Sequence, residues 1–180
     1  MKKPRSWKSR LGAGKLEQAC KPVDGFILVA EDDDDQFFLL SLALEKAGIA
    51  NPLLRARNGQ DVLDYIEGTS PCPARTEPPI PVLTLLDLHM PVMDGLDVLA
   101  AINSRPEPPK IPVVVLSSFA DSLTLELARR LGAKDCRIKP LDFSDLVRLV
   151  AEICSRWLGV GPEETQSHPR PVVSRPCELV

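Results

Sequence analysis

The sequence predicts an α/β fold, a doubly wound five-stranded parallel sheet flanked by five helices. Three observations support this fold class. Short apolar runs alternate with amphipathic segments from about residue 25 to residue 158, which is typical of successive strand–helix units. Several of the apolar runs are nearly continuous, as in strands that are buried on both faces. Polar residues follow these runs at the point where the carboxyl ends of parallel strands meet.

Two strands and two helices are expected in the first part of the domain. Residues 26–30 form an apolar strand, and a helix follows at 34–47, acidic at its start and stopped by Gly48. One face of this helix is apolar: Phe37, Leu40, Leu44 and Ala47. Residues 52–57 predict a weaker strand nearer an edge of the sheet, and a short helix spans about 60–67. Residues 68–80, which contain four prolines, predict a long exposed loop.

The second part continues the alternation. Residues 81–87 are almost wholly apolar, as expected of a central parallel strand, and a helix follows at 96–104. A fourth strand is predicted at 111–116, and a fourth helix at 121–131, capped by Asp121 and ended by Gly132. A brief fifth strand at 135–138 precedes a last helix at about 143–158. Its apolar stripe holds Leu146, Leu149, Val150, Ile153 and Trp157.

Composition sets the domain boundaries. The first 22 residues carry seven Lys or Arg against one acid, Glu17, and predict a basic flexible tail. Residues 160–180 are rich in proline and predict a second tail, which leaves 23–159 as one folded domain. A formal net charge of −3 gives no general reason to expect binding to nucleic acid or to a membrane surface.

The cysteines and the apolar runs indicate a cytoplasmic protein. Five widely spaced cysteines with no C-x-x-C pair argue against a disulfide framework or a zinc site. The basic N-terminus lacks the apolar segment of a signal peptide, and no run is long enough to span a membrane.

The segment from Leu85 to Gly95, LLDLHMPVMDG, is the most informative motif. Within this segment the predicted third strand ends at Asp87. Glu31 and Asp32 follow the first strand, Ser117 ends the fourth, and Lys139 follows the fifth. Strand ends meet at one edge of a parallel sheet, so these side chains are expected to converge there.

Such a cluster suits Mg²⁺ and phosphoryl chemistry. Mg²⁺ usually takes one or two carboxylates and retains several waters, so Asp32 and Asp87 are the expected ligands. Glu31 would act through a metal-bound water, and the backbone carbonyl of His89 is the expected further ligand. Asp87 could then serve as a nucleophile, with Lys139 and Ser117 contacting phosphoryl oxygens.

These residues make the chain resemble the receiver domain of two-component response regulators, from about residue 25 to 158. The resemblance implies the CheY-like strand order 2-1-3-4-5 and phosphoryl acceptance at Asp87, within D-x-x-M-P-x-M-D-G. It implies Mg²⁺ at Glu31 and Asp32, with Ser117 as the hydroxyl residue and Lys139 as the lysine of the K-P step. It also implies a cis peptide between Lys139 and Pro140.

One position departs from the family pattern. Receivers usually carry Tyr or Phe three residues before this lysine, and the chain has Cys136 there. The family's switch couples the hydroxyl residue to that aromatic ring, so the surface readout is expected to change. The aspartyl chemistry itself does not depend on this side chain.

The predicted function is that of a stand-alone response regulator, not an enzyme beyond its own phosphotransfer and dephosphorylation. The resemblance implies a histidine kinase or a phosphotransfer protein as donor. The Glu-Asp opening, the loop at 68–80 and Trp157 resemble regulators that partner bacterial phytochromes. Output is expected through a protein target, without direct DNA binding, and a homodimer through the exposed faces of the last two helices is plausible.

Two alternatives stay open. The first is a magnesium-dependent phosphatase of the haloacid dehalogenase type, which also uses an aspartyl nucleophile. Such enzymes carry a second acid two residues later, where this chain has His89. The second is a receiver-like module that binds partners without phosphorylation. The presence of all the expected charged groups argues against it.

Overall fold

The computed structural model describes residues 25–67 and 81–159, which form a sheet between two layers of helices. The elements alternate along the chain, as their bounds show: β1 Phe26–Ala30, α1 Asp34–Lys46, β2 Leu53–Ala56, α2 Gly59–Glu67, β3 Pro81–Leu86, α3 Gly95–Asn103, β4 Val113–Ser117, α4 Ser122–Arg130, β5 Asp135–Ile138 and α5 Phe143–Leu158. The predicted loop at 68–80 and both predicted tails lie outside the described residues.

The sheet has the predicted topology. All neighbouring strands are parallel, in the order β2-β1-β3-β4-β5. The sequence prediction of a strand near an edge at 52–57 is confirmed, because β2 is an outer strand. The chain reverses direction across the sheet between β1 and β3, which places the switch point at the carboxyl ends of these two strands.

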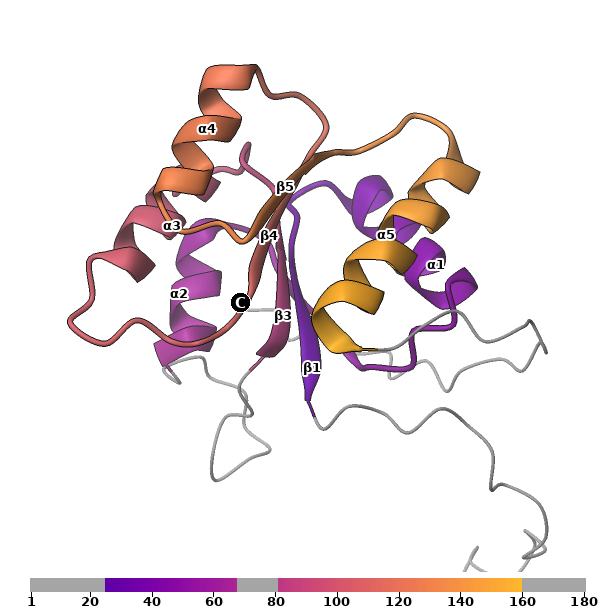
Figure 1. Ribbon diagram of the computed structural model, residues 1–180, viewed down its shortest axis with the longest axis horizontal. Helices are drawn as coiled ribbons and strands as arrows, with labels where there is room; N and C mark the ends of the chain where they lie inside the picture. The colour runs from indigo at the N-terminus through magenta and orange to yellow at the C-terminus, as the bar shows by residue number, and fades with distance from the viewer. Residues whose placement is uncertain (1–24, 68–80, 160–180) are drawn as a thin grey trace, which may run out of the picture.

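Two apolar cores flank the sheet. In Figure 1, α1 and α5 cover one face, and α2, α3 and α4 cover the other. Alternate residues of the central strands supply both cores, as the two-residue period of a strand requires. Leu85 of β3 packs in the core under α1 and α5, and Leu86 packs in the core under the other three helices.

Aspartates fix the start of four helices. Asp33, Asp94, Asp121 and Asp142 each accept a hydrogen bond from a backbone N–H in the first turn, at 2.8, 2.8, 2.7 and 3.1 Å. Each carboxylate satisfies one of the amides that a helix start leaves unpaired. Asp94, in the M-D-G segment, therefore acts as the N-cap of α3.

One strand begins two residues later than predicted. The fourth strand was expected at 111–116, but β4 begins at Val113 and includes Ser117. Pro112 has no N–H for a sheet ladder. At the other end, Ser117 pairs with Ile138 of β5, and this pairing buries the serine completely.

Candidate functional site

Asp87 lies at the end of β3 and is held by polar groups from three directions. Its side chain is buried, and Oδ1 accepts hydrogen bonds from Ser117 Oγ at 3.0 Å and from the backbone N–H of His89 at 3.2 Å. Oδ2 accepts from Lys139 Nζ at 2.9 Å. Both carboxylate oxygens are thus oriented by donors that the sheet positions.

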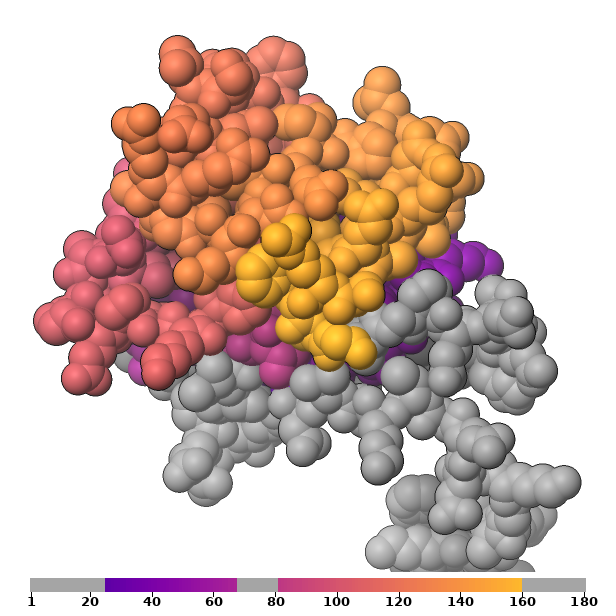
Figure 2. Space-filling model, in the orientation of Figure 1, coloured from indigo at the N-terminus to yellow at the C-terminus, as the bar shows by residue number. Residues whose placement is uncertain are grey.

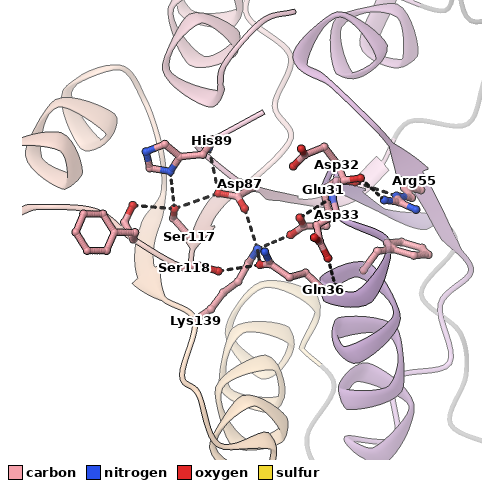
Figure 3. Close-up of polar contacts among 12 residues, drawn as sticks. Glu31, Asp32, Asp33, Gln36, Arg55, Asp87, His89, Ser117, Ser118 and Lys139 are labelled. Carbon is pink, nitrogen blue, oxygen red and sulfur yellow. Dashed lines mark hydrogen bonds and ion pairs between the residues drawn. The ribbon is translucent and has the colours of Figure 1, made fainter. Parts of the chain in front are cut away.

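Lys139 reaches this carboxylate from the end of β5. Its backbone N–H donates to Ser117 O at 2.8 Å, which extends the β4–β5 pairing and directs the side chain across the strand ends. Nζ forms an ion pair with Asp87 and a second with Glu31. Figure 3 shows the ammonium between these two carboxylates, as the sequence predicted for Lys139 and Asp87.

Glu31 and Asp32 differ sharply in environment. Glu31 is only 1% exposed, and this burial raises the pKa of its carboxyl even though the Lys139 ammonium opposes the shift. Asp32 is exposed, and its carboxylate has no hydrogen bond or ion pair to any described residue. In Figure 3 the Asp32 side chain lies beside Glu31, near Asp87.

The donor set fits a magnesium ion. No group of three or more His, Cys, Asp or Glu side chains among the described residues is arranged to hold a metal. Mg²⁺ does not require such a group, because it binds through one or two carboxylates and keeps several waters. The unpaired carboxylate of Asp32 and the buried Asp87 could supply those two, and a divalent cation would offset the repulsion among Glu31, Asp32 and Asp87.

The backbone after Asp87 is tightly packed against α3. The N–H of Gly95 donates to Leu88 O at 2.9 Å. A Cβ at Gly95 would lie 2.3 Å from the carbonyl oxygen of Asp87 and 2.9 Å from Leu88 Cα. Only glycine lets the helix start approach this closely, so the D-G step sets the path of the loop that carries Asp87.

A comparison of the sequence with protein families identifies the family of this chain. Residues 27–151 match the response regulator receiver domain. The chain belongs to the response regulator receiver domain family. Members of this family are the response regulators of two-component signalling systems.

Relatives agree with this assignment. The chain is 34% identical to the probable methanogenesis regulatory protein FilR2 of Methanothrix harundinacea, over 83% of this chain and 92% of FilR2. The phosphorylated cyanobacterial phytochrome response regulator RcpA has a similar structure, with a TM-score of 0.65, 30% identity, and coverage of 74% of this chain and 94% of RcpA.

A third relative concerns metal binding. The Mn²⁺-bound form of response regulator Rcp1 has a TM-score of 0.65 and 30% identity, covering 81% of this chain and 99% of that one. Divalent metal ions therefore bind within the receiver family.

The expected cis peptide of the receiver K-P step is wrong for this structure. No described peptide bond is cis, and Lys139–Pro140 is trans. An X–Pro bond prefers trans by only about 0.5–1 kcal/mol, so local context decides between the isomers. Lys139 reaches Asp87 with the trans bond.

Cys136 of this receiver domain lies in β5 and is 5% exposed. Burial raises the pKa of the thiol. Its Sγ lies 3.7 Å from Leu125 O of α4. A small apolar side chain, rather than a mobile aromatic ring, thus joins β5 to α4.

His89 has an exposed ring, but this ring also approaches the site. Nδ1 lies 3.4 Å from Ser117 Oγ. Sequence reasoning assigned only the His89 carbonyl and missed this contact. The ring can approach because His89 follows Asp87 by two residues, and the Asp87 carboxylate itself contacts Ser117 Oγ at 3.0 Å.

Three other polar residues at the receiver site were missed. Gln36 accepts from Lys139 Nζ at 2.9 Å and from Ser118 Oγ at 2.7 Å. Arg55 of β2 donates to the backbone carbonyls of Glu31 and Asp32, both at 2.8 Å, and pairs with Asp34. The only sequence signal for Arg55 was its place on the strand beside the acidic turn.

No helix in residues 25–67 or 81–159 has both the length and the apolar character needed to cross a membrane.

Proposed function

We propose that this receiver accepts a phosphoryl group on Asp87 in the presence of Mg²⁺ and signals through protein contacts. The observation that carries the proposal is the pair of hydrogen bonds to the buried Asp87 carboxylate. Lys139 Nζ lies 2.9 Å from Oδ2, and Ser117 Oγ lies 3.0 Å from Oδ1. Phosphoryl transfer needs little more than positioning and neutralisation of charge.

In the transfer step, a carboxylate oxygen of Asp87 forms a bond to phosphorus. The bond from phosphorus to the donor nitrogen of a phosphohistidine breaks, and its electron pair stays on the imidazole. Lys139 and Ser117 donate hydrogen bonds to phosphoryl oxygens, and later attack by water returns Asp87 and releases orthophosphate. Asp32 and Asp87, the carbonyl of His89 and, through water, Glu31 would hold Mg²⁺, which when bound neutralises charge on the phosphoryl oxygens.

The proposed donor is a histidine kinase or a phosphotransfer protein. Phytochrome response regulators are among the structural relatives, so a phytochrome-type kinase is the first donor to test. Large apolar side chains are exposed on the segments that follow β3, β4 and β5, where a protein donor must approach: Val92, Phe119 and Leu141. They support protein contacts rather than DNA as the route of output.

We also propose that the protein is cytoplasmic. Cys136 and Cys154, the two cysteines in the described part of the chain, are buried and are not in disulfides. A homodimer is the proposed assembly. Figure 2 shows the face formed by α4, β5 and α5, where two copies would meet. Size-exclusion chromatography of the phosphorylated and unphosphorylated protein would distinguish this assembly from a monomer.

Intact-mass spectrometry after incubation with acetyl phosphate and Mg²⁺ tests the central claim. We expect one added phosphoryl group, which is lost in Asp87→Asn, retained in Cys136→Ser and absent when EDTA removes the metal. If neither small donors nor the cognate kinase adds the group, the protein is a phosphorylation-independent module. Sustained turnover of p-nitrophenyl phosphate would instead identify a phosphatase.

A further inference from the structure

The ammonium of Lys139 has three acceptors. Glu31 Oε2 and Asp87 Oδ2 are charged, and the third is the neutral carboxamide oxygen of Gln36 at 2.9 Å. A lysine ammonium carries three N–H donors and no acceptor, so these three contacts satisfy it completely. Unlike Glu31 and Asp87, which are charged and buried, Gln36 is uncharged and only partly buried.

The same carboxamide oxygen accepts a second hydrogen bond. Ser118 Oγ donates to Gln36 Oε1 at 2.7 Å. Ser118 directly follows Ser117, which contacts the opposite oxygen of Asp87. Figure 3 shows Gln36 meeting Lys139 and Ser118 on one side of the site. One oxygen therefore joins the start of α1, the end of β5 and the segment that leaves β4.

Two features fix the Gln36 side chain in this role. Its backbone N–H donates to the Asp33 cap at 2.8 Å, which anchors the first turn of α1. The amide must present its oxygen to Lys139, because an ammonium can only donate. The orientation of the carboxamide thus follows from the chemistry of its neighbour.

We propose that Gln36 is a positioning residue for phosphoryl transfer, which holds the Lys139 ammonium against Asp87 and links it to Ser118. The inference rests on the proposed function. Without the carboxamide, one N–H of Lys139 loses its partner and the ammonium is held from two directions instead of three. Its mean position relative to the incoming phosphoryl group then becomes less defined, and transfer slows.

Gln36→Leu removes the oxygen and keeps similar bulk, and Asp35→Asn on the same helical turn is the matched control. With acetyl phosphate and saturating Mg²⁺, we expect the rate constant for phosphorylation to fall about tenfold in Gln36→Leu, the effect of one charge-assisted hydrogen bond. Asp35→Asn should keep the wild-type rate. An unchanged rate in Gln36→Leu, with wild type accepting the phosphoryl group, overturns the inference and leaves the proposed function intact.

A second readout does not depend on phosphorylation. Limited acetylation of the full chain, followed by peptide mass spectrometry, reports the reactivity of Lys139 against Lys46 as an internal reference. The Lys139 side chain is 11% exposed, and we expect its modification to increase in Gln36→Leu but not in Asp35→Asn. Unchanged Lys139 modification overturns the inference, because the Lys139 ammonium would then be held equally well without Gln36. If wild type accepts no phosphoryl group from any donor, the proposed function fails and this inference fails with it.

Discussion

Val92 shows how a single residue stores strain next to the site. It is the only described non-glycine residue with positive φ, at 67°, and it is the centre of a turn in which Met93 N–H donates to Pro91 O at 2.7 Å. A left-handed conformation costs an ordinary L residue roughly 1–2 kcal/mol, and a β-branched side chain is among the least suited to it. The side chain is 87% exposed, so it gains little from packing in return.

Val92→Asn should therefore stabilise the protein. Asparagine tolerates the left-handed region better than valine, and we expect the free energy of unfolding in urea to rise by about 1 kcal/mol. Val92→Ala removes the branched side chain but lacks the short polar group with which asparagine can hydrogen-bond locally, so as the control it should give a smaller change. A fall in stability of the Asn variant would show that the valine makes contacts that outweigh the strain.

Helix boundaries were predictable from sequence because their determinants are local. The caps at Asp33, Asp94, Asp121 and Asp142 start α1, α3, α4 and α5, and the predicted bounds differ from the observed ones by about one residue. The convergence of Asp87, Ser117 and Lys139 was also predictable, since parallel strand ends share one edge.

The roles of Gln36 and Arg55 were not predictable from the sequence, because they depend on how α1 and β2 pack beside the acidic turn.

The close packing of the start of α3 against the Asp87 loop predicts the effect of adding a side chain at Gly95. Gly95→Ala would force a Cβ against backbone atoms at 2.3 and 2.9 Å, so α3 or the loop must move. We expect a loss of about 2 kcal/mol in unfolding free energy, measured in urea, and slower phosphorylation of Asp87.

Gly48→Asn is the matched control. Gly48 has φ of 75°, which asparagine tolerates, and a Cβ there would meet nothing within 4 Å. We expect phosphorylation at the wild-type rate in this variant. If Gly95→Ala keeps both wild-type stability and wild-type rate, the close approach of α3 does not constrain the site.

At the scale of the molecule, two thiols report on the two sides of the sheet. Cys136 packs in the core under α2, α3 and α4, and Cys154 packs in the core under α1 and α5. Both are buried, and burial also raises the pKa of Cys136, which lowers its thiolate fraction near neutral pH. Because β1, β3 and β4 supply side chains to both cores, the two sides should open together.

Alkylation of a variant with Cys20→Ser, Cys72→Ser and Cys177→Ser tests this cooperativity. We expect both thiols to react at least about a thousandfold more slowly than in urea-unfolded protein, with the same apparent opening free energy. Quantitative peptide mass spectrometry at several urea concentrations measures each thiol separately. Much faster alkylation of one thiol would show that its helical layer detaches while the sheet persists.

The two outer strands restrict how copies of this chain can associate. β2 and β5 are each four residues long, and each carries an arginine, Arg55 and Arg137. Short, charged margins discourage strand addition from a neighbouring molecule. Continuation of the sheet from one copy into another is thus disfavoured, and the protein can expose apolar side chains for recognition with little risk of growing into fibrils.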